Sequence, residues 1–189
     1  MKTLIFNGSP RKNGDTVSLL KHFIAQLPGE YKIVEAYRAD ISPCLDCRYC
    51  KTQSGCVIQD EMQEVYEYLK DCDNVLIASP VYFSELTGPL LSVGSRLQTY
   101  FCGKFFRKEE SGLTPKKGAV LLVGGGDGKP DKAYETAKTL LKNMNCKEIH
   151  PLVCSHNTDR IPAREDAQAV AGMDDIVRFF SSMQLQRRR

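Results

Sequence analysis

The sequence predicts a doubly wound α/β fold, in which five parallel strands form a sheet with helices on both faces. Short apolar runs rich in strand-forming residues alternate along the chain with segments of helical periodicity. One of these runs, NVLIASP at 74–80, is apolar almost throughout, as expected of a strand buried on both faces. Strands that alternate with helices in this way indicate a parallel sheet covered on both sides.

The expected elements can be placed along the chain. Strands are expected at 3–8, 31–37, 74–80, 118–126 and 148–154. Helices are expected at 16–27, 60–70, 86–101, 131–145 and 163–181. The first helix is predicted from Val17, Leu20, Ile24 and Leu27, which follow the spacing of one helix face. Pro89 is compatible with the third helix if it lies in the first turn.

Length, composition and charge bound the class of protein. The 189 residues, of which 42% are hydrophobic, suffice for one domain with a substantial core, so residues 1–189 are expected to form a single domain. The net charge of +3 comes largely from the terminal RRR, expected to be a solvated end, and no basic aromatic motif accompanies it, so no nucleic-acid partner is expected.

Hydropathy predicts a cytoplasmic protein without a membrane partner. No apolar run approaches the length of a bilayer, and the TLIF run near the N-terminus is too short for a secretion signal. In the cytoplasm thiols stay reduced. Clustered cysteines are therefore expected to serve metal or redox chemistry more than structural disulfides.

Three loops are expected to form the ligand site, because ligands of such folds bind at the C-terminal ends of the strands. These loops are 8–16, 79–87 and 124–129. The first joins a buried strand directly to a helix, in the stretch NGSPRKNGDT. It matches neither the P-loop pattern nor the G-x-G-x-x-G fingerprint, which disfavours a nucleoside triphosphate or a Rossmann-bound NAD.

The first loop has the chemistry of a phosphate site. The hydroxyls of Ser9 and Thr16, the cations of Arg11 and Lys12, and the N–H groups at the helix start can all bind an anion. A single terminal phosphate fits this set best.

The second and third loops suit a planar ring. Pro80 ends a strand, and Tyr82 and Phe83 supply apolar area on which a ring could pack. The third loop carries glycines at 124, 125, 126 and 128, which leave room for a ligand to lie against the backbone.

The motifs GSPRKNGDT and SPVYFSELTG together resemble the flavodoxin-like, NAD(P)H-dependent FMN reductase family, over roughly residues 1–155. The resemblance implies a flavodoxin-like sheet of order 2-1-3-4-5, FMN as cofactor and NAD(P)H as a possible electron donor. The implied FMN contacts are Ser9, Arg11, Asn13, Thr16, Val17, Pro80, Val81, Tyr82, Phe83, Ser84, Gly124, Gly125 and Gly126.

Within that resemblance, the first loop would hold the phosphate and the other two would approach the isoalloxazine ring. The family's first loop usually carries Asn or Ser where this chain has Asp15. A carboxylate is unfavourable beside a phosphate, so Asp15 is not assigned to the site. No catalytic side chain is assigned either, because the flavin carries the chemistry.

Four cysteines follow the second strand in the stretch PCLDCRYCKTQSGC, with the spacing C-x2-C-x2-C-x5-C. They are Cys44, Cys47, Cys50 and Cys56, in a segment, 41–59, that is expected to be an insertion. Structural zinc sites usually pair two C-x2-C knuckles across a long spacer. Three cysteines at two-residue gaps are closer to the wrapping around a [4Fe–4S] cube. Zinc, and free or redox-active thiols, remain open.

The cysteine spacing also resembles that of the iron–sulfur flavoproteins, a branch of the same FMN-binding fold. This implies a [4Fe–4S] cluster that exchanges single electrons with FMN in a homodimer or homotetramer. Simple FMN reductases keep a similar segment, so the pattern marks the superfamily better than the cluster. The remaining cysteines, Cys72, Cys102, Cys146 and Cys154, are expected to be buried apolar residues.

The sequence therefore predicts an FMN-dependent oxidoreductase that passes electrons between FMN and a [4Fe–4S] cluster, with small molecules or proteins as donor and acceptor. One alternative is a cluster-free NAD(P)H-dependent FMN or quinone reductase. A second alternative is not an enzyme: an interaction domain stapled by zinc on a flavodoxin-like scaffold.

Overall fold

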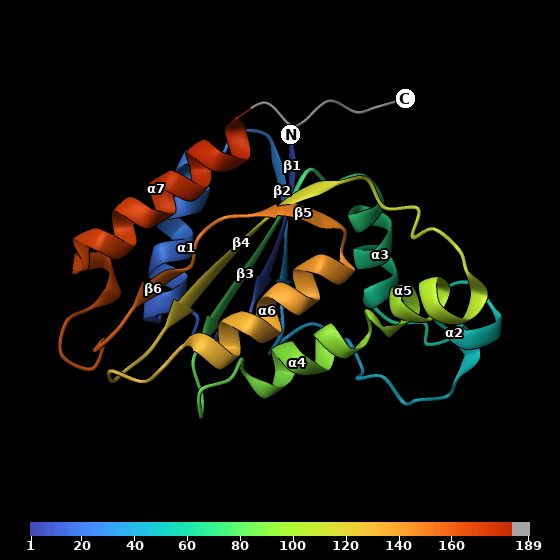
Figure 1. Cartoon of the computed structure of the whole chain (residues 1–189). Coiled ribbons are helices and arrows are strands. Elements are labelled where there is room, and N and C mark those ends of the chain that lie inside the picture. The colour runs from blue at the N-terminus through green and yellow to red at the C-terminus, as the bar shows by residue number, and fades with distance from the viewer. Residues whose placement is uncertain (183–189) are drawn as a thin grey trace.

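A parallel sheet forms the centre of the molecule in the computed structural model, which describes residues 1–182 (Figure 1). The terminal RRR at 187–189, expected to be a solvated end, lies outside the described residues. Helices cover both faces of the sheet, with α1 and α7 on one side and α3, α4 and α6 on the other. This arrangement confirms the predicted doubly wound α/β class.

Six strands make up the sheet within residues 1–182. They are β1 (Lys2–Asn7), β2 (Glu30–Glu35), β3 (Asn74–Pro80), β4 (Lys116–Val123), β5 (Cys146–Ile149) and β6 (Val153–Ser155). All pairings between them are parallel, in the order β2-β1-β3-β4-β5, and β6 also pairs with β4. The predicted order 2-1-3-4-5 is confirmed.

The prediction of one continuous last strand over 148–154 is wrong. The edge beside β4 is divided into β5, next to the first half of β4, and β6, next to its end. Pro151 lies between them. Because proline has no N–H to give to a ladder, it interrupts the strand at that point.

Helices and short helical turns connect the strands. They are α1 (Asp15–Gln26), α2 (Tyr49–Thr52), α3 (Met62–Asp71), α4 (Gly88–Ser95), α5 (Gln98–Cys102), the π-helical turn η1 (Gly103–Arg107), α6 (Asp131–Asn143), the 3-10 turn η2 (Ala163–Glu165) and α7 (Ala167–Ser181). Pro89 lies in the first turn of α4, as expected.

The prediction of a single helix over 86–101 is also wrong. The chain forms α4 and then α5, with Arg96 and Leu97 between them. At this break the N–H groups of Arg96 and Leu97 bond to the carbonyls three residues earlier, at 3.1 and 3.0 Å. Such bonds tighten the turn and change the helix direction.

Two apolar cores lie on the two faces of the sheet. Along β1, Leu4 and Phe6 pack with α3 and α4, whereas Ile5 between them packs with α1 and α7. Alternate side chains of a strand point to opposite faces, so one buried strand serves both cores. Each fully buried side chain of this size contributes about 1.5–3 kcal/mol. The sheet is thus a rigid base for the loops at its C-terminal edge.

The cysteine segment, residues 41–59, lies between β2 and α3 and carries only the short helix α2. It packs beside α5 and η1, away from the sheet (Figure 1). Its status as an insertion into the fold stays a prediction. Across residues 1–182, no helix has the length and apolar character needed to cross a membrane.

Candidate functional site

A cleft of ≈ 250 Å³ opens at the C-terminal edge of the sheet, between the loops that follow β1, β3 and β4. We call it the loop cleft. Of the predicted FMN contacts, the structure places Ser9, Arg11, Thr16, Pro80, Val81, Tyr82 and Gly125 on its lining. Of the others, Asn13, Phe83, Ser84, Gly124 and Gly126 lie in the same loops and Val17 lies in α1, and none of them is on the lining. The rule that ligands bind at the strand ends therefore selected three loops that meet around one cavity.

The first loop leaves β1 through a crowded position at Gly8. The Gly8 N–H donates to the Ala78 carbonyl at 2.8 Å, and Thr87 Oγ1 donates to the Gly8 carbonyl at 2.9 Å. A Cβ at this position would lie 2.9 Å from Leu90 Cδ2, from Ser79 Oγ and from Thr87 Oγ1. Only glycine fits so close to three side chains, and this contact holds the loop against β3 and α4.

The polar groups of the first loop converge on the start of α1. Ser9 is buried, its N–H donates to Asn7 Oδ1 at 3.0 Å, and its Oγ accepts from the Arg11 N–H at 3.3 Å. Thr16 is buried in the first turn of the helix, while Arg11 is exposed at the cleft mouth. Free N–H groups and the helix dipole make such a helix start favourable for an anion.

Asp15 lines the same cleft, but its carboxylate is hydrogen-bonded within the protein. Its Oδ1 accepts a hydrogen bond from the Ala163 N–H at 2.8 Å, which joins the start of α1 to η2. Asn13 is exposed, and its Oδ1 accepts from Lys21 Nζ at 3.0 Å. Both side chains therefore have protein partners.

The second loop ends in a tight turn over residues 82–85. Tyr82 and Glu85 exchange two backbone hydrogen bonds, at 2.9 and 3.0 Å, around Phe83 and Ser84. These two central residues have φ values of 52° and 61°, the left-handed region that turns of type I′ require. Phe83 is fully exposed at the tip, whereas Tyr82 is half exposed and faces the cleft. Left-handed non-glycine residues carry strain, which proteins concentrate at functional loops.

Thr158 and Asp159, which sequence reasoning missed, reach the cleft beside the third loop. Their N–H groups donate to the carbonyls of Gly124 and Gly125, at 3.1 and 3.2 Å. A Cβ on Gly125 would lie 2.6 Å from Asp159 Oδ2, so glycine permits this contact. Both follow β6 closely, and the rule that selected the other three loops would have found them had it also been applied to the loop after the last strand.

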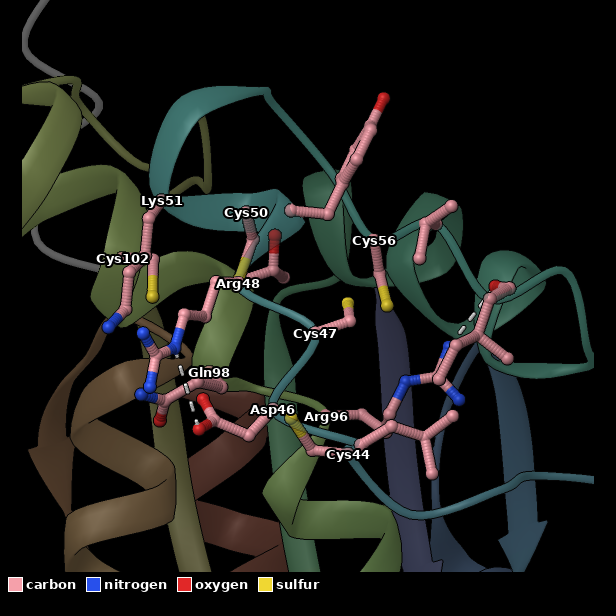
Figure 2. Close-up of a pocket in the computed structure, with 15 residues that line it drawn as sticks. Cys44, Asp46, Cys47, Arg48, Cys50, Lys51, Cys56, Arg96, Gln98 and Cys102 are labelled. Atoms are coloured by element: carbon pink, nitrogen blue, oxygen red, sulfur yellow. Dashed lines mark hydrogen bonds and ion pairs between the residues drawn. The ribbon is translucent and has the colours of Figure 1, made fainter.

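The four clustered cysteines line a second pocket, next to α5 (Figure 2). We call it the cysteine pocket. Asp46 and Arg48, between the cysteines, have φ values of 48° and 63°, which curl the backbone around the pocket. Cys47 is the most exposed of the four, and Cys44, Cys50 and Cys56 are half buried.

Cys102 belongs to the cysteine pocket as well. It was expected to be a buried apolar residue, and it is buried, with 1% of its surface exposed. It lies beside Cys50: burial and a hydrogen bond with Cys102 raise the pKa of Cys50 to about 11. Sequence spacing had no signal for this contact, because 52 positions separate the two thiols (102 − 50).

The chemistry of the cysteine pocket fits a metal centre. Cysteine sulfur is the usual ligand of iron–sulfur clusters, and the four clustered cysteines share this pocket with Cys102. Among the residues that the structure describes, however, no three His, Cys, Asp or Glu side chains form a group that could hold a metal ion. The donor chemistry fits, while the ligand geometry stays a prediction.

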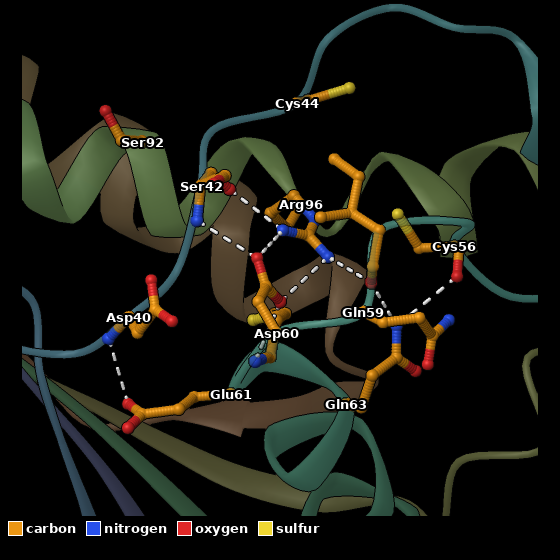
Figure 3. Close-up of polar contacts among 12 residues, drawn as sticks. Asp40, Ser42, Cys44, Cys56, Gln59, Asp60, Glu61, Gln63, Ser92 and Arg96 are labelled. Atoms are coloured by element: carbon orange, nitrogen blue, oxygen red, sulfur yellow. Dashed lines mark hydrogen bonds and ion pairs between the residues drawn. The ribbon is translucent and has the colours of Figure 1, made fainter.

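A buried ion pair between Arg96 and Asp60 lies where the two ends of the cysteine segment come together (Figure 3). Arg96, whose side chain is 0% exposed, donates to Asp60 Oδ2 at 2.6 Å, to the Ser42 carbonyl at 2.9 Å and to the Ile58 carbonyl at 3.2 Å. Asp60 in turn accepts from the N–H groups of Ser42 and Met62, at 3.0 and 3.1 Å. The Arg96–Asp60 pair thus ties both ends of the segment to the break between α4 and α5.

Electrostatics strengthen the Arg96–Asp60 pair. Burial raises the pKa of Asp60, but the hydrogen bonds from Arg96 and from the Ser42 and Met62 N–H groups outweigh it, so that the pKa lies below its usual value. Three further contacts hold the segment: Cys44 N–H to Ser95 Oγ at 2.9 Å, Thr99 Oγ1 to the Gly55 carbonyl at 2.9 Å, and Arg107 Nη1 to the Cys50 carbonyl.

Most of the chain, with the loop cleft inside it, matches a known family. The model of the NADPH-dependent FMN reductase family matches residues 1–159. The chain belongs to this family of FMN-dependent oxidoreductases. The family predicted from the loop motifs is thereby confirmed.

Two curated relatives of this family member are iron–sulfur flavoproteins. One, from Methanocaldococcus jannaschii, is 34% identical over 128 residues, covering 66% of this chain and 62% of the relative. The other, from Methanosarcina thermophila, is 31% identical over 128 residues, covering 66% of this chain and 64% of the relative. The chain therefore matches a little under two thirds of the length of these relatives.

A solved structure of similar fold is an NAD(P)H:quinone oxidoreductase from Methanothermobacter marburgensis. It superposes with a TM-score of 0.68 at 15% identity, covering 100% of this chain and 98% of that one. At this low sequence identity the similarity is evidence about the fold alone. The superposition confirms the predicted flavodoxin-like fold of this FMN reductase family member.

Proposed function

We propose that this chain is an electron-transfer flavoprotein in which FMN occupies the loop cleft and Cys44, Cys47, Cys50 and Cys56 hold a [4Fe–4S] cluster. The observation that carries the proposal is the gathering of these four cysteines on one pocket, in a chain of an FMN-dependent family. Bound FMN can exchange electrons singly or as hydride, and an iron–sulfur cluster exchanges one at a time.

The residues of the first loop would bind the FMN phosphate. Ser9 and Thr16 supply hydroxyls, Arg11 supplies a cation, and the start of α1 supplies N–H groups, all on the loop cleft. Charge-assisted hydrogen bonds of this kind are the strong ones in proteins. Asn13 and Val17 complete the proposed contacts at the edge of this group.

The other two loops would hold the ring. Pro80, Val81 and Tyr82 line the cleft with apolar surface, and the Gly125 backbone lies on it without a side chain. A planar apolar ligand gains contact area from the first three, and Gly125 lets the backbone come close. The proposed contacts from the same loops that do not line the cleft are Phe83, Ser84, Gly124 and Gly126.

A homodimer or homotetramer is part of the proposal. Leu45, Tyr49 and Val57, on the lining of the cysteine pocket, are 69%, 40% and 48% exposed. Phe106, which stacks under Lys51 at 4.8 Å, is 53% exposed beside them. Grouped apolar side chains of this kind favour burial against a second copy. We further propose a cytoplasmic location, with NAD(P)H or a reduced protein as donor.

A second candidate is a cluster-free NAD(P)H-dependent FMN or quinone reductase. It is favoured by the lack, within residues 1–182, of a three-residue group that could hold a metal ion. In this case the cysteines would be free or redox-active thiols. The non-enzymatic alternative, a zinc-stapled scaffold without flavin, is weaker, because the chain belongs to an FMN-dependent oxidoreductase family.

The test is purification without oxygen, followed by an absorption spectrum and by iron, sulfide and flavin assays on one sample. The proposal expects one FMN and about four irons per chain, with loss of iron in Cys47→Ser. Cys146→Ser is the matched control, because Cys146 is buried outside the cysteine pocket and should keep iron at the wild-type level. Bound flavin with iron near zero would instead support the cluster-free reductase.

A further inference from the structure

Arg96 has a donor that the fold leaves unused. An arginine carries five N–H groups. The four on Nη1 and Nη2 serve the Ser42 and Ile58 carbonyls and the two carboxylate oxygens of Asp60. The fifth, on Nε, is buried and has no hydrogen-bond partner anywhere in the described part of the chain.

Such a donor needs an acceptor. The side chain is 0% exposed, and leaving a buried N–H unpaired costs the free energy of its desolvation. Folding has fixed the guanidinium through the Arg96–Asp60 pair, so Nε cannot turn to solvent. Its partner must therefore come from the pocket that Arg96 lines.

Cysteine sulfur atoms are among the acceptors that line this pocket. Arg96 lines the cysteine pocket, and Figure 2 shows its side chain beside those of Cys44 and Cys56. Figure 3 shows the same three side chains from another direction. A thiol accepts hydrogen bonds only weakly, whereas a metal-bound thiolate or an inorganic sulfide is anionic and accepts strongly.

We propose that Arg96 is a positioning residue of the cysteine centre, whose Nε–H donates to a sulfur atom of the cluster held by the four cysteines. This inference rests on the proposed function. Asp60 and the Ser42 and Ile58 carbonyls bind both Nη atoms, which fixes the guanidinium in place beside the pocket. A hydrogen bond to a cluster sulfur stabilises the more negative, reduced form, so Arg96 raises the reduction potential.

The first test is redox titration of the iron-loaded protein with Arg96→Lys, which keeps a positive charge and removes the Nε–H. We expect unchanged iron content and a tenfold shift of the reduction equilibrium toward the oxidised form, about 59 mV for a one-electron couple. Arg107→Lys is the matched control: Arg107 also bonds to the segment, at the Cys50 carbonyl, but it does not line the cysteine pocket. Its potential should equal that of the wild type.

The second test keeps arginine at position 96 and so does not depend on whether Arg96→Lys protein folds. Protein grown with 15N-labelled arginine, reduced and studied by pulsed electron paramagnetic resonance, should show hyperfine coupling between the cluster and an arginine nitrogen. Arg48 also lines the pocket, so the label is measured in Arg48→Lys protein. Loss of the coupling in that background would overturn the assignment to Arg96.

The outcomes distinguish failure of the cluster from failure of the role of Arg96. Wild-type protein without iron after anaerobic reconstitution overturns the cluster, and this inference with it. Iron-loaded wild type with no arginine coupling, or Arg96→Lys protein with an unchanged potential, overturns the role of Arg96 alone. A lowered potential together with the coupling supports both.

Discussion

Arg96 and Asp60 form an ion pair that is almost completely enclosed, with exposed side-chain fractions of 0% and 7% and a shortest N–O distance of 2.6 Å. Asp60→Asn leaves the guanidinium without its counter-charge, and breaking a buried pair from one side costs about 3–5 kcal/mol. We expect a loss of that size in the free energy of unfolding, measured by urea titration. Glu64→Gln breaks the exposed pair with Lys32 and should cost no more than about 1 kcal/mol. Equal losses in the two variants would contradict a structural role for the pair.

Gly8 should not tolerate a side chain. A Cβ there meets three side-chain atoms at 2.9 Å, from Ser79, Thr87 and Leu90, and overpacking of this kind costs about 1–3 kcal/mol. Gly8→Ala should therefore lower the thermal midpoint and weaken FMN binding, because the first loop must shift. Gly88→Ala is the control, since among the described residues no atom other than those of its chain neighbours and the backbone of its own helix lies within 4 Å of its added Cβ. A Gly8→Ala protein as stable as the control would refute the close approach.

Arg11 should select for the phosphate of the cofactor. Its side chain lies at the mouth of the loop cleft, and a hydrogen bond to a charged group contributes about 1.5–3 kcal/mol. Arg11→Gln should weaken FMN binding by roughly 10- to 100-fold in fluorescence titrations of apoprotein, in line with that free energy. Riboflavin, which lacks the phosphate, should bind the variant and the wild type equally. An equal loss for both ligands would place Arg11 at the ring instead.

Asp174 should give the stability a dependence on acid pH. Hydrogen bonds from Gln26 and His22, on α1, lower the pKa of this carboxyl on α7. Because the folded pKa lies below the unfolded value of about 3.9, the stabilisation is complete above that pH and is lost as the pH falls through the folded pKa. The pair is partly exposed, so we expect less than about 1 kcal/mol.

The measurement is the free energy of unfolding of Asp174→Asn between pH 3 and pH 7. The difference from wild type should be largest at pH 7 and should shrink toward pH 3. Asp175→Asn is the control, because Asp175 pairs with Arg178 within α7 and does not link two helices. A stability difference between Asp174→Asn and wild type that grows as the pH falls would contradict the prediction.

Local sequence was sufficient for the parts of the fold that local physics decides. The run at 74–80 reads as a doubly buried strand and is β3 with the same bounds, and Pro89 lies in the first turn of its helix. Loops placed at strand ends by this alternation converge at one edge, because all the strands are parallel. That is why three loops far apart in the chain could be assigned to one cleft from the sequence alone.

Contacts between residues that are far apart in the sequence could be identified only from the tertiary structure. Arg96 and Asp60 are 36 positions apart, and nothing in either neighbourhood indicates that they meet. Cys102 joins the cysteine pocket because the helix expected over 86–101 breaks at Arg96, which turns α5 toward residues 41–59. Thr158 and Asp159 reach the cleft because their N–H groups bond to the Gly124 and Gly125 carbonyls, which brings the loop after β6 beside the loop after β4. The periodicity of apolar residues indicates which face of one segment is buried. Which residues of different segments meet depends on how the segments pack, and that is decided by the whole chain.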